Sequence, residues 1–229
     1  PILWALIIIL IGVWILLGPI LNRGSKEIRQ LSIPLQGAAE AEVVLQHGAG
    51  RIHLSALQTP GELLSGTYQG GVETRHTAGT ITRLELSPDT NGVWFGPGMG
   101  FIWNFGLNRD IPIRLRLEAG AGETIMDLSD LLVKDLYIGT GASSTEVTLP
   151  ARASYTQVKI EAGVASVRVR VPDGVAANIH METGLTGKTI DTNRFAALGE
   201  GNYRSVDYEN AANRVDIRVE AGVGSIEIF

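Results

Sequence analysis

The chain has 229 residues, of which 45% are apolar, and a formal net charge of −5. This length allows one large domain or two small ones, and the apolar fraction is sufficient for a buried core. Lys and Arg are mixed with Asp and Glu, so no basic face forms and we predict no nucleic-acid partner. The sequence contains no cysteine, which excludes disulfides and thiolate chemistry.

The chain begins with an uncharged apolar segment, "PILWALIIILIGVWILLGPIL", over residues 1–21. This is long enough to cross a hydrocarbon layer about 30 Å thick, so we predict a transmembrane helix in the lipid bilayer. The alternative is a cleaved signal peptide, which the length of the run and the missing small-x-small cleavage site disfavour. The candidate anchor residues are Trp4, Ile8, Ile11, Trp14 and Leu17.

A short basic linker, residues 22–31, is expected after this helix. It contains Arg23, Lys26 and Arg29 against a single acid, Glu27. Positive residues beside a span favour the cytoplasmic side of the membrane. A solitary helix with its N-terminus inside would instead place the rest of the chain outside, so both orientations stay open.

From about Ile33 onward the sequence predicts β-strands. The segments "IPIRLRLE" (111–118), "VRVRVP" (167–172) and "VDIRVE" (215–220) alternate apolar with charged residues, as strands with one buried and one wet face do. No long apolar pattern with a 3.6-residue period appears. Residues 32–229 are therefore predicted to form a single all-β domain.

A glycine phrase recurs along this domain, for example in "LEAGAGETI", "IEAGVASV" and "VEAGVGSI". Between Gly120 and Gly184 the copies come about every 20 residues, enough for two strands and their turns. One such unit cannot bury its apolar face alone, so the copies must stack into a solenoid-like β domain. Glycine suits sharp turns and close backbone approach. The expected repeat-turn glycines are Gly48, Gly50, Gly120, Gly122, Gly139, Gly141, Gly163, Gly184, Gly222 and Gly224.

In their order along the chain, these phrases resemble the bacterial LiaF-like membrane proteins with a toast-rack β domain, relatives of adhesin-type domains built from the same repeat. The matching segments include "LIIILIGVWILL", "LSIPLQGAAEAEVVLQHGAGRIHL", "IPIRLRLEAGAGETIMDLSDL" and "ANRVDIRVEAGVGSIEIF". The resemblance implies a toast-rack fold on a non-catalytic, membrane-anchored protein of the bacterial cell envelope. It further implies a role in sensing envelope stress, beside a sensor kinase.

The residue chemistry predicts neither a cofactor nor an enzyme. The four histidines, His47, His53, His76 and His180, lack further obvious ligands for a metal and are expected on strand surfaces. The glycine phrases lack the third glycine of a dinucleotide site, and "TGKT" (186–189) lacks the upstream glycine of a phosphate loop. No Gly-x-Ser-x-Gly elbow occurs.

The segment "NGVWFGPGMGFIWNFGLN", residues 91–108, gathers most of the chain's Trp and Phe. One interpretation is a loop that folds back to cap one end of the β stack and covers edge strands. The other is an exposed contact with the bilayer interface or a partner protein. We favour the cap. The residues concerned are Trp94, Phe95, Phe101, Trp103 and Phe105.

The expected function is that of a protein-binding or scaffolding module at the bacterial cell membrane. Two alternatives remain, an accessory structural subunit of a larger membrane complex and a self-associating, adhesin-like module. Self-association would use the final strand "SIEIF" as an uncapped edge, so replacing Ile226 and Ile228 by Lys should abolish it. Residues 203–213 are expected to form a loop before that strand.

Overall fold

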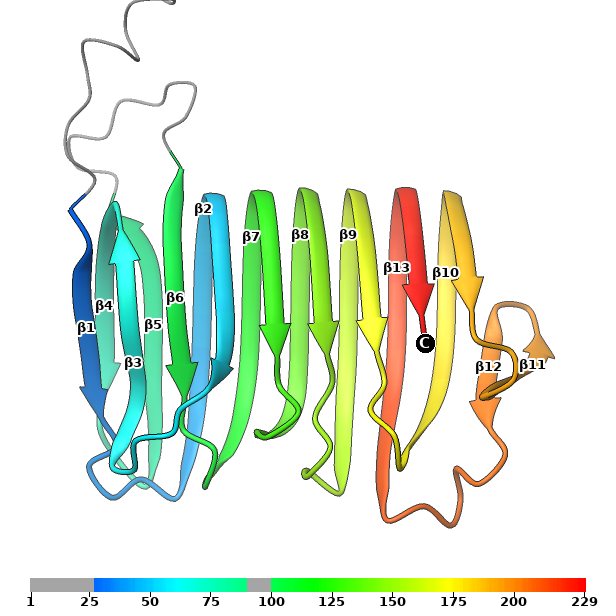
Figure 1. The fold of residues 1–229 in the computed structure, drawn as a ribbon, viewed down its shortest axis with the longest axis horizontal. Helices are drawn as coiled ribbons and strands as arrows, with labels where there is room; N and C mark the ends of the chain where they lie inside the picture. Colours follow the sequence, from blue (N-terminus) through cyan, green and yellow to red (C-terminus); the bar gives the residue numbers. More distant parts are fainter. Residues whose placement is uncertain (1–26, 90–99) are drawn as a thin grey trace, which may run out of the picture.

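A computed structural model of the chain describes residues 27–89 and 100–229 (Figure 1). The described residues form an all-β fold, as predicted, and it has thirteen strands. The strands are β1 (Arg29–Pro34), β2 (Glu40–Ala56), β3 (Glu62–Gln69), β4 (Gly71–Thr77), β5 (Ile81–Asp89), β6 (Phe101–Leu107), β7 (Pro112–Asp127), β8 (Leu132–Thr148), β9 (Tyr155–Arg170), β10 (Val175–Ile190), β11 (Phe195–Gly199), β12 (Asn202–Ser205) and β13 (Asn213–Ile228).

Six long strands determine the architecture, because each bends back on itself. They contain 16 or 17 residues each and pair in parallel in the order β2-β7-β8-β9-β13-β10. The first half of each strand belongs to one layer and the second half to the other, and the bends align at one side of the molecule, uppermost in Figure 1. We call this row of bends the crest. It comprises residues 48–50, 120–122, 141–143, 163–165, 222–224 and 184–186.

The hydrophobic core lies between the two layers. In β7, for example, Ile113, Leu115 and Leu117 of the first half and Met126 of the second half are buried. The residues between them in the first half, such as Arg114 and Arg116, face outward. The alternation read from the sequence is therefore the alternation between core and solvent.

Shorter strands complete both layers. On one side of β2, the first-half layer continues through β5 and β4, and the second-half layer through β6, β3 and β1. At the other end, β12 pairs with Asn178–His180 of β10, and β11 pairs with β12. Beyond Leu185, β10 pairs with β13 alone among the described strands.

The C-terminal strand is not an edge of the sheet. The alternative of self-association through an uncapped "SIEIF" end assumed that it was, and this assumption is wrong. β13 lies between β9 and β10 and pairs in parallel with both. Ile226 is 1% exposed and Ile228 is 0% exposed. The side chains proposed to recruit another copy are part of the core.

Three boundary expectations also change or cannot be followed. β1 begins at Arg29, so the last residues of the expected linker belong to the sheet, and Tyr203 lies in β12 instead of a loop. The predicted transmembrane helix, residues 1–21, and its five anchor residues lie outside the described residues. Across residues 27–89 and 100–229, no helix has the length and hydropathy that a membrane span requires.

Candidate functional site

The bends of the crest depend on a row of stacked glycines. A Cβ added to Gly120 would lie 2.5 Å from the carbonyl oxygen of Gly48, and one added to Gly141 would lie 2.5 Å from that of Gly120. Such contacts are far inside van der Waals distance, so only glycine lets successive strands approach here. The row consists of Gly48, Gly120, Gly141, Gly163, Gly222 and Gly184.

A second set of glycines sits two residues further along the bends. Gly50, Gly122 and Gly224 have φ angles of 137°, 130° and 140°, which side chains with a Cβ rarely adopt. Gly122 and Gly224 are the most constrained, since a Cβ on either would lie 1.9 Å from a carbonyl oxygen, that of Gly50 or that of Ala165. These residues turn the strand from one layer to the other.

Gly139 is the exception among the expected turn glycines. It pairs with Glu118 and Glu161 in the first half of the strands, and the ring of Tyr137 lies 3.1 Å from where its Cβ would be. The bend of β8 is therefore formed at Gly141. In "YIGTGASS" the phrase is displaced by two residues relative to the other copies, which spacing alone did not reveal.

A groove runs beside the crest, across the outer side of the first halves of the long strands. It has a volume of about 1180 Å³ and its lining includes stacked crest glycines such as Gly120 and Gly163. Its charged carboxylates are Glu118, Glu161, Glu220 and Glu182, and the lining also includes small side chains such as Ala119, Thr140 and Ala162. The groove and the crest thus lie next to each other along the molecule.

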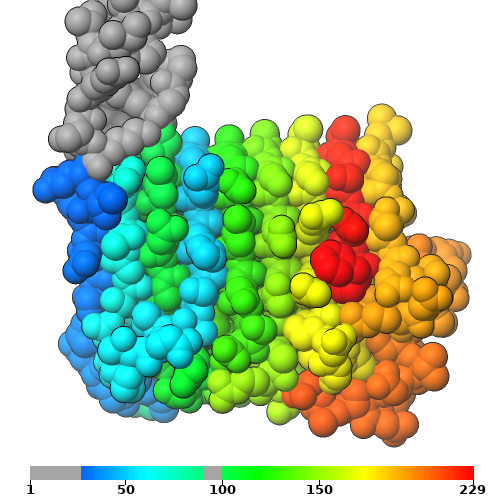
Figure 2. Space-filling view, in the orientation of Figure 1, coloured from blue at the N-terminus to red at the C-terminus, as the bar shows by residue number. Residues whose placement is uncertain are grey.

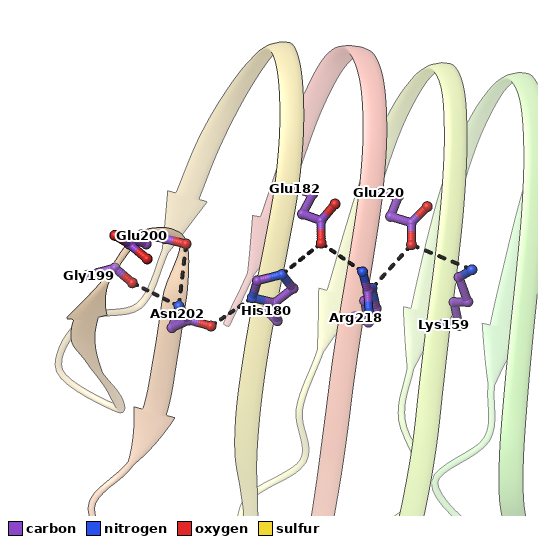
Figure 3. Close-up of polar contacts among 8 residues, drawn as sticks. All are labelled: Lys159, His180, Glu182, Gly199, Glu200, Asn202, Arg218 and Glu220. Carbon is purple, nitrogen blue, oxygen red and sulfur yellow. Dashed lines mark hydrogen bonds and ion pairs between the residues drawn. The ribbon is translucent and has the colours of Figure 1, made fainter.

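Two rows of charged residues lie along this groove, and we call them the charge ladder. One row holds the four glutamates, and the adjacent row holds basic side chains two residues earlier in each strand. Figure 3 shows its end at β9, β13 and β10. The ladder comprises Glu118, Glu161, Glu220 and Glu182 with Arg116, Lys159, Arg218 and His180.

The charge ladder is a chain of alternating ion pairs. Lys159 Nζ lies 2.6 Å from Glu161 and 3.5 Å from Glu220, and Arg218 lies 3.1 Å from Glu220 and 2.7 Å from Glu182. Because the strands pair in parallel and in register, about 4.8 Å apart, Glu220 and Glu182 each lie between the basic residue of their own strand and that of one neighbouring strand.

Two further groups take part in the ladder, one at its β10 end and one within it at β8. At β10, His180 Nε2 lies 2.9 Å from Glu182 and Nδ1 lies 2.7 Å from Asn202 of β12 (Figure 3). At β8, Tyr137 fills the basic row. Its hydroxyl donates to Glu161 at 2.7 Å, and the guanidinium of Arg116 lies 3.9 Å from its ring centroid.

Contacts within the ladder shift the pKa values of several of its members. The hydrogen bond from Lys159, followed by that from Tyr137, lowers the pKa of Glu161. Hydrogen bonding to His180, followed by the charge of Arg218, lowers the pKa of Glu182. Asn202 and then Glu182 raise the pKa of His180. Glu161 and Glu182 are therefore ionised at neutral pH, beside the positive charges of Lys159 and Arg218.

A repeated sequence signal marks the ladder, which the sequence analysis did not single out. "LRLEAG", "VKIEAG", "IRVEAG" and "IHMETG" each place a basic residue two positions before a glutamate. Their alternation was interpreted only as a strand with one wet face. Stacking the phrases in register converts these separate pairs into one continuous row.

Residues 101–107 form a strand within the sheet, so for this part of the segment both the favoured capping loop and the alternative of an exposed contact are wrong. Phe101, Trp103 and Phe105 are 5%, 0% and 2% exposed, because β6 pairs with β2 and β3 and turns alternate residues into the core. Trp94 and Phe95 lie outside the described residues.

His47 is also not on a strand surface as expected. It is 3% exposed, and its ring packs edge-on against Trp103 with 4.9 Å between the centroids. Burial lowers the pKa of His47, against a smaller effect of a backbone hydrogen bond at Phe101. His53 of the same strand is exposed, so the two histidines face opposite ways. Within the ranges that the structure describes, no three His, Cys, Asp or Glu side chains gather to hold a metal.

Comparison with known proteins agrees with this geometry. A family model described as the N-terminal domain of toast_rack, DUF2154, matches residues 22–170. The chain belongs to the toast-rack family. Its bent, parallel strands form the toast-rack β domain (Figure 1), and the space-filling view shows successive segments of the chain standing side by side (Figure 2).

Two solved structures are similar to this toast-rack domain. The crystal structure of "a putative cell adhesion protein" from Clostridium sporogenes ATCC 15579 has a TM-score of 0.80 and 25% identity, covering 88% of this chain and 98% of that chain. That of "a putative adhesin" from Bacteroides fragilis NCTC 9343 has a TM-score of 0.36 and 10% identity, covering 90% and 98%. No curated protein matches the chain.

Proposed function

We propose that this toast-rack protein is a membrane-anchored, non-catalytic binding module of the bacterial cell envelope, and that its charge ladder binds a membrane protein partner. The observation that carries the proposal is the ladder itself. It places one acid and one base on each of β7, β9, β13 and β10, with Tyr137 of β8 in the basic row between β7 and β9. Ordered rows of opposite charge favour one partner and one register over others.

The shape of the groove supports a protein partner over a small molecule. Small ligands are usually enclosed in concave, mostly apolar pockets. Here the lining combines glycine backbone and small side chains with glutamates that are partly exposed, such as Glu161 and Glu220. An extended segment or a flat surface of a partner fits such a site.

The N-terminal segment supports the membrane location. Residues 1–21 carry no charge and are long enough for a span. The resemblance to LiaF-like proteins extends the proposal to a regulatory role, in which the partner is a sensor kinase that responds to envelope stress. An accessory role in a larger membrane complex uses the same anchor and the same ladder.

Adhesion is the second candidate function, and the similarity to the Clostridium sporogenes protein favours it. A self-associating module needs a free strand edge. The second half of β10, from Leu185 to Ile190, is such an edge among the described strands, whereas β13 is not.

Charge reversal in the ladder tests the proposal. Cells that produce the full chain with Lys159→Glu and Arg218→Glu are treated with a membrane-impermeant crosslinker, and the protein is purified in mild detergent and its partners are identified. Arg168→Glu is the matched control, because Arg168 pairs with Glu227 on the other layer. We expect the double variant to lose the partner and the control to keep it. Loss in both, or in neither, would contradict binding through the ladder.

A further inference from the structure

The crest carries no charged residue at any of its positions, in contrast to the ladder beside it. Its six bends read Gly-Ala-Gly, Gly-Ala-Gly, Gly-Ala-Ser, Gly-Val-Ala, Gly-Val-Gly and Gly-Leu-Thr. The middle residues of these bends are paired in register across the sheet. In spatial order they are Ala49, Ala121, Ala142, Val164, Val223 and Leu185.

The apolar side chains grow larger and remain exposed toward β10. Val164 is 62% exposed, Val223 is 47% exposed and Leu185 is 84% exposed. They are direct neighbours on β9, β13 and β10. Single exposed apolar residues are common on soluble proteins, but an adjacent, uncharged row of them marks an interaction surface.

The chain enters the fold on the same side as this row. β1 starts at the level of the crest (Figure 1), and Ile28, just before it, is 64% exposed. Only residues 22–28 separate β1 from the apolar segment 1–21. Seven residues of extended chain reach at most about 25 Å. The start of β1, at the level of the crest, therefore lies within about 25 Å of the end of the apolar segment.

The entry point and the exposed row lie at opposite ends of the molecule. In the second-half layer, β1 is one edge and β10 the other, with seven strands between them. At about 4.8 Å per step, the two ends are roughly 40 Å apart. Two attachments this far apart would fix the orientation of the whole rack.

We propose that the crest docks on the lipid bilayer, with Val164, Val223 and Leu185 inserted among the headgroups and upper acyl chains. The inference rests on the proposed membrane anchor. With residues 1–21 holding one end and the apolar row holding the other, the long axis of the rack lies parallel to the membrane. The acidic row of the charge ladder, two residues before the crest glycines, is then held beside the membrane surface.

The chemistry of the crest sets the lipid requirement. The bends contain no Lys or Arg, so anionic lipids provide no electrostatic attraction to the row. Docking should therefore occur on zwitterionic phosphatidylcholine and change little with salt, since apolar insertion is not screened.

Single-cysteine labelling tests the inference directly, because the chain has no cysteine of its own. Full-length V164C, V223C and L185C are labelled with an environment-sensitive fluorophore and reconstituted in phosphatidylcholine vesicles that contain a spin-labelled lipid quencher. The matched controls are V206C and I81C, whose native side chains are 95% and 45% exposed. Val206 follows the end of β12 and Ile81 starts β5, both on the side away from the crest.

We expect the lipid quencher to reduce the fluorescence of all three crest labels several-fold more than that of either control, at low and at high salt. Equal quenching at the five positions would overturn the inference. Flotation of the same vesicles separates the two proposals. Protein that floats with unquenched crest labels refutes the docking and leaves the anchor standing, whereas protein that does not float refutes both.

Discussion

At the scale of single residues, the absence of a side chain controls how closely the strands stack. Every residue of the first crest row is glycine, and the spaces where a Cβ would stand at Gly120 and Gly141 are occupied by the carbonyl oxygen of the preceding strand. The requirement is steric at these positions, because their φ angles are not in the left-handed region. The glycine phrase thus encodes close contact between repeats.

Substitution of one stacked glycine should therefore destabilise the domain. For Gly120→Ala we expect a loss of about 1–3 kcal/mol in the free energy of unfolding, as for overpacked cores. Gly187→Ala is the control, because its Cβ would meet its nearest heavy atom at 3.8 Å. Urea denaturation measures both variants. Equal stability of the two would show that the close approach can relax without cost.

Buried His47 and hydrogen-bonded His180 should make the stability of the domain depend on pH with opposite signs. The pKa of His47 is lowered from 6.5 in the folded protein, so the unfolded chain binds its proton first and stability falls as pH drops below about 6.5. The pKa of His180 is raised, so its contribution is present below about 6.5 and is lost as pH rises through its folded pKa.

Denaturation of two variants between pH 5 and 8 checks these signs. His47→Leu should reduce the loss of stability on acidification, and His180→Gln should increase it. Each variant is compared with the parent protein as a difference between the two pH values, so a change in overall stability cancels. If His47→Leu leaves the dependence of stability on pH unchanged, the prediction is wrong, because protonation of His47 would then not cost stability in the folded core.

At the scale of elements, the sequence predicted the strands better than their order. Alternation in "IPIRLRLE" marked core and solvent correctly because the layers bury one face of each strand. The order was not predictable in the same way. Strands with the same pattern and the same bend are interchangeable partners, so nothing local places β13 between β9 and β10.

The charge ladder and the aromatic strand show the same limit. Arg218 and Glu220 could be read as outward residues, but only the register brings Arg218 to Glu182 of another strand. In residues 101–107 the aromatic residues occupy every second position up to Phe105, a strand signal that the many glycines obscured. Contacts between distant segments come from the stacking of repeats, which a single strand pattern does not specify.

The central place of β13 gives a prediction about its apolar residues. Ile226→Lys should destabilise the domain by about 3 kcal/mol or more, because a charge would enter the core without a partner. Ser225→Lys is the control, since Ser225 is exposed on the same strand. Urea denaturation distinguishes them. A stable, folded Ile226→Lys protein that differs only in self-association would restore the edge-strand interpretation.

The ladder is expected to matter more for binding than for folding. Arg218 and its two partners are about half exposed or less, and exposed ion pairs contribute about 0–1 kcal/mol each. Arg218→Gln should therefore change the free energy of unfolding by no more than about 1 kcal/mol. A larger loss in urea denaturation would assign the ladder a structural role instead.

At the scale of the whole molecule, the toast-rack has two distinct long surfaces that lie side by side, the crest and the charge ladder. The crest is uncharged and partly apolar, and the ladder beside it carries alternating charges. The chain enters on the crest side (Figure 1). A rack anchored at that side would present its ladder along the membrane, within reach of other membrane proteins.

Site-specific photocrosslinking in native membranes tests this account most directly. A photoreactive residue is placed in the full chain at Gln157, exposed in the first half of β9 beside the ladder, and separately at Glu146, exposed in the second half of β8. We predict that Gln157 crosslinks to a defined membrane protein and that Glu146 does not. The same products from both positions, or none from Gln157, would contradict the claim that the ladder is the binding surface.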